Sequence, residues 1–195
     1  MEVICYTDVK SPYAFLAFAE TCRLEDAWGK PFIWRHHTLH IDTYLDAVEV
    51  RTAHNWRKVK YAYMDCRRLA NRQGLTLYGP KKIFDSRPAG IGMSYADNQG
   101  LVRPYLDTAF RRFFQRDLET GDPEVIEALL KQVGADTSGF AAWYDGEGGR
   151  LHDSQRAEAE ESGVFGVPAI TLDGEMFWGG DRLNLVAERL EQARG

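Results

Sequence analysis

The residues best suited to chemistry stand near the two ends of the chain. Near the start, Ser11 precedes Pro12, the order of a helix-capping serine with proline at the first helical position. A helix N-terminus offers free N–H donors and a positive partial charge, which lowers the pKa of a thiol placed there. Here that position carries a serine and no cysteine. Its hydroxyl can either donate a hydrogen bond to an anion or serve only as the helix cap.

A second candidate is a glycine- and proline-containing stretch near the end of the chain. It reads Gly163-Val164-Phe165-Gly166-Val167-Pro168. This stretch is a poor helix, and it precedes two apolar runs separated by Asp173-Gly174, a pair that favours a tight turn. The pattern predicts a loop that enters a β-hairpin, residues 169–172 and 175–177, through Pro168. Proline suits the first residue of a short buried strand because it lacks an N–H donor.

Composition and charge bound the class of protein. A chain of 195 residues suits one domain, or one domain with a large insertion. It begins with strand-like sequence and has no long apolar run, so we expect a cytoplasmic protein without a membrane segment. The net charge is −5, yet residues 51–87 hold ten Lys or Arg against two Asp or Glu. This asymmetry favours a local anionic ligand over a nucleic-acid surface, or else marks a solvated helical face.

Other residues that could do chemistry form no recognised site. The cysteines are widely separated and make no C-x-x-C pair, so we expect them to pack; they are Cys5, Cys22 and Cys66. A histidine-rich segment matches no defined set of metal ligands, and we expect no metal; it holds His36, His37, His40 and Asp42. The Gly90-Ile91-Gly92 run lacks the third glycine and the preceding strand of a dinucleotide-binding loop.

An α/β framework would position the candidates. Residues 2–6 alternate as a first strand, a helix runs from Pro12 to about Trp28, and residues 32–36 form a second strand. This order is a βαβ unit, in which the helix provides the crossover that a parallel strand pair needs. The chain closes with a helix over residues 151–162, the hairpin and a final helix. The inner stripe of that last helix is Leu183, Val186 and Leu190.

Between residues 41 and 149, hydrophobic residues recur at helical spacing and no convincing strand appears. The pattern predicts four helices: one ending near Gly74, one over 101–114, one over 123–133 and one through Trp143. A Gly-, Pro- and Lys-rich loop is expected over residues 77–92. The whole order, βαβ…αββα, is that of a thioredoxin-like α/β fold with a large helical insertion. We expect a thioredoxin-like domain of residues 1–40 and 150–195 and a helical insertion domain of residues 41–149.

In a thioredoxin fold the start of the first helix, the proline loop and the start of the last helix converge, and we expect the bond before Pro168 to be cis. The motifs at these three places resemble a known family. They are Asp8-Val9-Lys10-Ser11-Pro12-Tyr13, the loop ending in Val167-Pro168, and Phe177-Trp178-Gly179-Gly180-Asp181-Arg182-Leu183. The chain is similar to 2-hydroxychromene-2-carboxylate isomerases, whose wider relatives are kappa-class glutathione transferases and DsbA-type oxidoreductases. The closing motif is the specific part of the resemblance.

The resemblance implies roles for individual residues. Ser11 would be catalytic, donating a hydrogen bond to the thiolate of bound glutathione. Val167 and Pro168 would bind the cysteinyl part of glutathione by strand-like pairing. Gly180 and Asp181 would hold the γ-glutamyl part, with the carboxylate at the ammonium group. The alternative for Asp181 is ordinary helix capping.

Two more residues gain a role from the resemblance. Lys58 belongs to a pattern, Lys-x-x-Tyr-x-x-x-Asp-x-x-Arg, on one helix face and would reach the glycine carboxylate of glutathione. An Asp65–Arg68 pair without function is the alternative for the end of that pattern. Arg87 would bind the substrate carboxylate, or else is an ordinary surface arginine. Residues 36–50 depart from the family's usual sequence, which leaves the identity of the substrate open.

The implied reaction is cis–trans isomerisation of an aromatic 2-hydroxychromene-2-carboxylate to a trans-o-hydroxybenzylidenepyruvate in a homodimeric enzyme. A thiolate would add to a conjugated carbon, permit rotation about the resulting single bond, and leave. No redox change is needed, which agrees with a serine at the helix start. Three alternatives stay open: a kappa-like glutathione transferase, a non-catalytic thioredoxin-like binding module, and a DsbA-like oxidoreductase. The last would need a cysteine at an exposed helix start.

Overall fold

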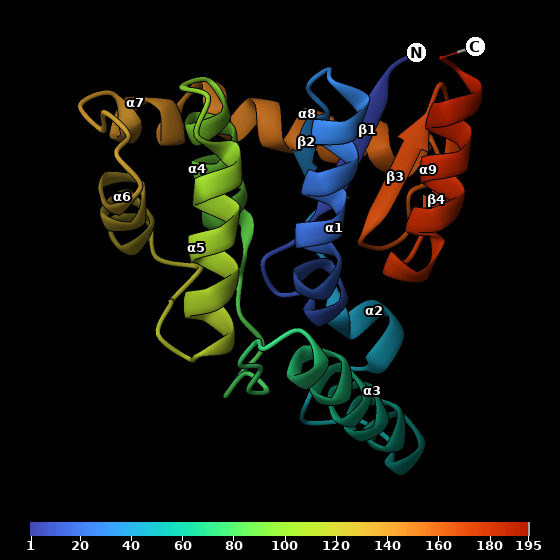
Figure 1. Ribbon diagram of the computed structural model, residues 1–195. Coiled ribbons are helices and arrows are strands. Elements are labelled where there is room, and N and C mark those ends of the chain that lie inside the picture. The colour runs from blue at the N-terminus through green and yellow to red at the C-terminus, as the bar shows by residue number, and fades with distance from the viewer. Residues whose placement is uncertain (195) are drawn as a thin grey trace.

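The computed structural model describes residues 1–194. At its centre is a four-stranded sheet with the strand order β2-β1-β3-β4 (Figure 1). The strands are β1 (Val3–Thr7), β2 (Ile33–His36), β3 (Ala169–Leu172) and β4 (Glu175–Trp178). β1 runs parallel to β2 and antiparallel to β3, and β3 and β4 form an antiparallel hairpin. The predicted thioredoxin-like framework is confirmed.

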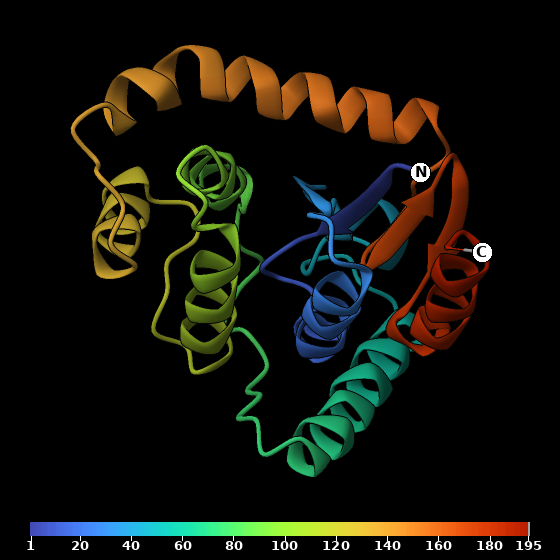
Figure 2. The ribbon, with the colours of Figure 1, turned by 45° about the horizontal axis from the view of Figure 1, so that its top comes forward.

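Helices cover both faces of this sheet. Helices α1 (Pro12–Trp28) and α9 (Leu183–Gln192) lie next to each other on one face, and α8 (Glu147–Glu161) runs along the other (Figure 2). The two central strands are therefore buried along their whole length. Strands covered on both sides read as continuous apolar runs, which explains the sequences of β1 and β3.

Local sequence signals set the ends of these elements. Ser11 caps α1, since its Oγ accepts a hydrogen bond from the Ala14 N–H at 3.2 Å, and proline follows it at the first helical position. In the hairpin, Asp173 and Gly174 have φ values of 47° and 89°. A two-residue turn with positive φ at both positions matches the twist of the two strands, and Asp-Gly is a favoured pair for it. Both predicted signals are confirmed.

The segment between β2 and α8 contains helices and, within the described residues, no strand. The helices are α2 (Ile41–Leu45), α3 (Ala53–Arg72), α4 (Arg87–Asp97), α5 (Val102–Phe114), α6 (Pro123–Gln132) and α7 (Phe140–Asp145). Helix α3 lies at the edge of the molecule in both views (Figures 1 and 2), and most of its residues are exposed. The predicted helical insertion is confirmed.

Aromatic side chains join the helical segment to the α/β part. Phe15 of α1 stacks on Phe114 of α5 with ring centroids 5.2 Å apart, and Phe18 contacts Phe110 at 5.7 Å. These rings belong to one continuous hydrophobic cluster. Helix α8 begins at Glu147 and extends from the helical segment to the sheet (Figure 2). The division into domains of residues 1–40 with 150–195 and 41–149 stays a prediction.

The loop predicted for residues 77–92 is wrong in its last part, because α4 begins at Arg87. Its two glycines have low helix propensity, but each allows a close approach. A Cβ on Gly90 would lie 2.5 Å from His36 Nδ1, and one on Gly92 would lie 2.4 Å from Ile126 Cγ2. The glycines therefore pack α4 against β2 and α6, and tertiary contacts outweigh the local propensity that favoured a loop.

Candidate active site

The start of α1 meets the proline loop through the Ser11 side chain. Ser11 is 3% exposed, and its hydroxyl donates to the Val167 carbonyl at 3.2 Å while accepting from the N–H of Ala14. The bond between Val167 and Pro168 is cis, as expected. Among the described residues, nothing accepts a hydrogen bond from the Val167 N–H. The structure therefore brings three of the predicted residues together and leaves one backbone donor without a protein partner.

Glycine and aromatic residues fix the shape of the proline loop. Gly166 packs so closely that a Cβ there would lie 2.9 Å from Trp178 Nε1. The ring of Trp178 lies against Phe165, with centroids 4.9 Å apart, although Phe165 is 62% exposed. The loop thus presents an aromatic side chain to solvent while β4 supports it from behind.

The start of the last helical segment also lies against α1. Gly179 has φ 102° and ψ 147°, a conformation that favours glycine, and the 3-10 helix η1 (Gly180–Arg182) follows it. A Cβ on Gly180 would lie 3.1 Å from the Cβ of Ala17 on α1. Asp181 pairs with Arg182 at 2.7 Å, is largely exposed, and makes no capping hydrogen bond to η1 or α9. Its carboxylate is accessible to a ligand, and the capping alternative gains no support.

Two predicted binding residues lie outside this convergence. Lys58 is exposed on α3 and has no ion-pair partner among the described residues, whereas Asp65 and Arg68 on the same helix pair at 3.7 Å. Arg87 is paired elsewhere: its Nε and Nη2 donate to the two carboxylate oxygens of Asp153 on α8 at 3.0 and 2.8 Å. Its role in substrate binding stays a prediction, with the guanidinium already engaged.

A buried carboxylate to which the sequence assigned no role anchors the loop before Ser11. Asp8 is fully buried, and it accepts hydrogen bonds from the Lys10 N–H at 2.9 Å, the Leu39 N–H at 2.8 Å and the Ser86 hydroxyl at 3.0 Å. Burial alone would raise the pKa of Asp8, but neighbouring His36 and Lys10 and the Leu39 N–H outweigh it and hold the pKa well below its usual range. Asp8 thus ties together the α1 loop, the loop after β2 and the start of α4.

Two histidines, Thr38 and Asp153 form a chain of hydrogen bonds beside Asp8. The Thr38 hydroxyl lies 3.2 Å from His36 Nδ1 and 3.0 Å from His152 Nε2, and His152 Nδ1 lies 3.2 Å from Asp153 Oδ1. Burial lowers the pKa of His152 to about 4, with a smaller contribution from His36. The histidine of α8 is therefore neutral near pH 7 and supports the loop after β2 by hydrogen bonding.

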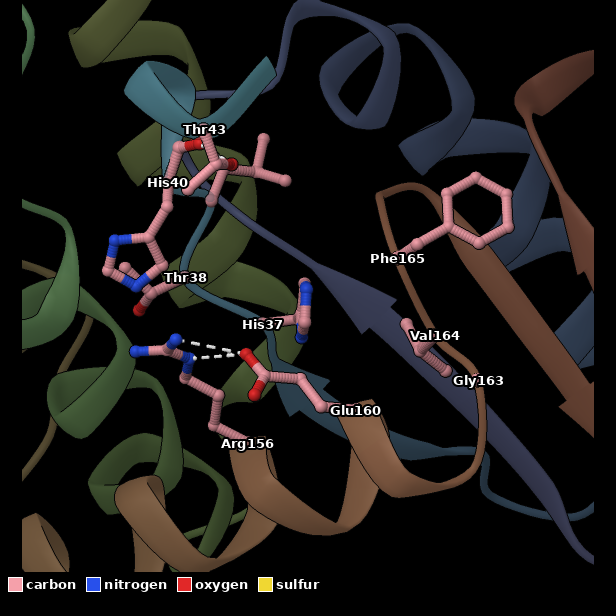
Figure 3. Close-up of a pocket in the computed structure, with 10 residues that line it drawn as sticks. His37, Thr38, His40, Thr43, Arg156, Glu160, Gly163, Val164 and Phe165 are labelled. Atoms are coloured by element: carbon pink, nitrogen blue, oxygen red, sulfur yellow. Dashed lines mark hydrogen bonds and ion pairs between the residues drawn. The ribbon is translucent and has the colours of Figure 1, made fainter.

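A pocket of about 390 Å³ opens beside the proline loop (Figure 3). The loop after β2, the last turns of α8 and the loop before Pro168 line it. Its polar wall is formed by His37, Thr38, His40, Thr43, Arg156 and Glu160. Leu39, Val164 and Phe165 provide the apolar part. The pocket thus shares the proline loop with the Ser11 site.

The chain's own sulfur atoms lie away from the helix start. Cys5, Cys22 and Cys66 are all buried and unpaired. Burial raises the pKa of Cys22 and Cys66 to about 11 and raises that of Cys5 well above its ordinary value. Such thiols are inert compared with a thiolate at a helix N-terminus. Within residues 1–194, no group of three or more His, Cys, Asp or Glu side chains could hold a metal ion, and no helix has the length and hydropathy to cross a membrane.

The order of elements is βαβ…αββα, and a cis-proline loop contacts the start of α1. Together these features define a thioredoxin-fold protein. Comparison with known proteins agrees: the model of the DsbA-like thioredoxin domain matches residues 2–191. A 2-hydroxychromene-2-carboxylate isomerase of Pseudomonas putida is 30% identical over 200 residues, covering 100% of this chain and 95% of the relative. The enzyme of that name from Pseudomonas sp. strain C18 is 27% identical over 183 residues, covering 91% and 84%.

Comparison with solved structures indicates the same family and fold. A 2-hydroxychromene-2-carboxylate isomerase matches with a TM-score of 0.78 at 26% identity, covering 99% of this chain and 96% of the other. The cytosolic disulfide reductase DsbM of Pseudomonas aeruginosa, solved with GSH, shares the fold with a TM-score of 0.65 at 19% identity over the full length of both chains. The chain belongs to the DsbA-like thioredoxin family and, within it, to the family of 2-hydroxychromene-2-carboxylate isomerases.

Proposed function

We propose that this isomerase depends on glutathione and interconverts an aromatic 2-hydroxychromene-2-carboxylate with the trans-o-hydroxybenzylidenepyruvate. The observation that carries the proposal is the contact between Ser11 Oγ and the Val167 carbonyl at the N-terminus of α1, in a chain whose three cysteines are all buried. A thiolate at this place would have to come from a ligand. The isomerase names of the relatives and the GSH in the DsbM structure support the proposal.

In the proposal, three separate parts of the chain bind glutathione. The Val167 N–H has no acceptor among the described residues and would donate to the peptide part of glutathione. The accessible carboxylate of Asp181 would bind the ammonium group. Lys58, exposed and unpaired within the described chain, offers a cation to the far carboxylate. When bound, glutathione would supply the thiol that adds reversibly to the substrate.

The chain's own contribution is to hold negative charge at the start of α1. The free N–H groups and positive end of the helix favour an anion there. The Ser11 hydroxyl carries one proton, which it shares with the Val167 carbonyl. In the proposal Ser11 transfers this hydrogen bond to the ligand's sulfur, while the Val167 carbonyl accepts from the ligand's peptide N–H instead. A charge-assisted hydrogen bond of this kind stabilises the anion by about 1.5–3 kcal/mol.

Two measurements test the proposal. Calorimetric titration with glutathione should show binding, and the absorbance of the bound thiolate followed against pH should give a lowered thiol pKa that Ser11→Ala raises by about 1–2 units. Turnover of a chromene carboxylate should require glutathione. No binding at millimolar glutathione would overturn the proposal and favour a non-catalytic module. Conjugation of a halogenated arene without isomerisation would instead indicate a kappa-like transferase. A cytoplasmic homodimer also stays a prediction.

A further inference from the structure

The lysine that precedes Ser11 has its charged end inside the protein. The Lys10 side chain is 7% exposed, its Nζ donates to the Leu39 carbonyl at 2.9 Å, and the same nitrogen lies 3.8 Å from Asp8 Oδ2. A buried ammonium group is costly unless it is paired and hydrogen-bonded, and Lys10 meets both conditions. The loop that leads into α1 therefore carries a buried cation next to a buried anion.

The Asp8 carboxylate lies close to the start of α1. The Ser11 N–H donates to the Asp8 carbonyl at 2.9 Å, and the Lys10 N–H donates to Asp8 Oδ1 at the same distance, so residues 8–11 form a tight turn. The Cα atoms at the two ends of such a turn are less than ~7 Å apart. An anion bound beside the Ser11 hydroxyl would thus lie within roughly 10 Å of the Asp8 carboxylate.

Two negative charges at this separation oppose each other. The start of α1 favours an anion through its free N–H groups and its positive end. A fixed carboxylate nearby raises the pKa of a thiol placed there, because like charges disfavour ionisation. At about 10 Å and an effective dielectric constant of about 20, the thiol pKa rises by ~1 unit. This rise is as large as the fall expected from one hydrogen bond of Ser11, so an unbalanced Asp8 would cancel much of the benefit.

The titratable groups that face Asp8 come from two places. Lys10 belongs to the same loop, and His36 of β2 brings its Nε2 to 3.5 Å from Asp8 Oδ1. Leu39 and Ser86, from the loop after β2 and the start of α4, contribute only neutral donors. His36 is a cation only when it is protonated. Within residues 1–194, Lys10 is the one lysine or arginine that pairs with Asp8.

We propose that Lys10 is a positioning residue of the anion site: its ammonium group neutralises Asp8, so that the start of α1 can stabilise a sulfur anion beside Ser11. Asp8 can then hold the surrounding loops together as a hydrogen-bond acceptor without opposing the thiolate. The effect of Lys10 on turnover rests on the proposed function. Its effect on charge applies to any thiolate at this place.

The first experiment places a thiol at the site and needs no glutathione. In the Ser11→Cys variant, the new thiol is titrated by the ultraviolet absorbance of its thiolate. The chain's own cysteines do not interfere, since burial raises the pKa of all three while a helix N-terminus lowers that of the new thiol. We expect Lys10→Met in this background to raise the thiol pKa by ~1 unit. Lys60→Met, the same change at an exposed position of α3, should leave it unchanged.

Removing Asp8 as well separates the charge of Lys10 from its packing. Asp8→Asn in the Ser11→Cys background should lower the thiol pKa, because Lys10 then acts without its counter-charge. The double change Lys10→Met with Asp8→Asn should bring the pKa back to within ~0.3 unit of the Ser11→Cys protein. Lost packing alone would not be restored by a second disruptive substitution. An unchanged thiol pKa in Lys10→Met, or a raised pKa that persists in the double variant, would overturn the inference.

Urea titration first establishes that each variant is folded. If Lys10→Met alone does not fold, the step from Asp8→Asn to the double variant removes the same charge and should raise the thiol pKa by ~1 unit. The absence of that rise would contradict the proposal.

Turnover distinguishes this inference from the proposed function. With Ser11 in place, Lys10→Met should raise the thiol pKa of bound glutathione and lower turnover most at the lowest pH, whereas Lys10→Arg keeps the charge and should keep the wild-type pH profile. If the wild type binds no glutathione, the proposed function fails, yet the titrations in the Ser11→Cys background still decide the role of Lys10. If glutathione-dependent turnover is present and those titrations do not respond to Lys10, this inference alone is wrong.

Discussion

Replacing Asp8 by asparagine removes the main anchor of the loop that carries Ser11. One carboxylate oxygen accepts from the Lys10 N–H, and the other accepts from the Leu39 N–H and the Ser86 hydroxyl. Because both oxygens accept, either orientation of an asparagine amide places its NH2 group against a donor. The carboxylate also lies 3.8 Å from the buried ammonium of Lys10. The variant therefore loses hydrogen bonds and leaves a buried cation without its counter-charge.

The expected cost follows from the burial. Removing one partner of a buried ion pair lowers the free energy of unfolding by about 3–5 kcal/mol. In a chain of 195 residues this corresponds to a fall in Tm of ~6–20 °C. Asp153→Asn is the matched control, since the same chemical change removes the ion pair between Asp153 and Arg87. The Asp153 side chain is 61% exposed. The cost of this substitution should be about 1 kcal/mol or less. Urea unfolding near pH 7, followed by tryptophan fluorescence, measures both variants.

The dependence on pH gives a second check. The pKa of Asp8 is held well below its usual range, so the carboxylate binds protons more weakly in the folded than in the unfolded chain. Its stabilisation is complete above the unfolded-state pKa of about 4 and is lost as the pH falls below that value. The difference in the free energy of unfolding between wild type and Asp8→Asn should therefore become smaller below about pH 4. If Asp8→Asn near pH 7 lies within about 1 kcal/mol of Asp153→Asn, the assignment of Asp8 as a buried structural anion is wrong.

Three further changes have defined outcomes. Ser11→Ala loses a helix cap and a hydrogen bond to the loop, so its free energy of unfolding should fall by about 2 kcal/mol in urea titration; unchanged stability would contradict both contacts. The pKa of His152 is lowered to about 4, so folding stability should decrease by up to about 3 kcal/mol as the pH falls from 6.5 to 4, and His152→Gln should flatten that slope. Gly92→Ala should lower the Tm despite a gain in helix propensity, because its Cβ would overlap Ile126, whereas Gly121→Ala, with no contact under 3.5 Å, should change it little.

The elements that sequence predicts correctly are those with local signals. Ser11 before proline marks the start of α1, and Asp173-Gly174 fixes the hairpin turn. Helix α4 has a weaker signal: a proline stands in its first turn, but its N-cap residue Ser86 makes no capping hydrogen bond and its glycines have low helix propensity. It forms because those glycines let the helix approach β2 and α6 closely. No short window of sequence contains that information.

The candidate site divides in the same way. Ser11, Val167 and Pro168 could be placed together once the order of elements indicated a thioredoxin-like fold. Asp8 could not be recognised as an anchor, because its partners Leu39 and Ser86 follow it by 31 and 78 residues. The engagement of Arg87 likewise depends on a carboxylate 66 residues later in the chain. Contacts between residues so far apart in the chain depend on packing and cannot be predicted from the spacing of residues in the sequence.

The serine at the start of α1 has a consequence for how the site can work. The helix end and the cis-proline loop create a place that favours an anion, and the Ser11 hydroxyl there is held between the Ala14 N–H and the Val167 carbonyl. A serine in this position is a hydrogen-bond donor that can turn to another acceptor. Among the described residues, no general base accepts a hydrogen bond from Ser11 and so activates it as a nucleophile. Since Cys5, Cys22 and Cys66 are all buried, the described chain offers no thiolate of its own at this place. Chemistry by sulfur here requires a ligand that carries it, so Ser11→Cys should not by itself create an efficient oxidoreductase, because the variant gains one thiol but no resolving partner.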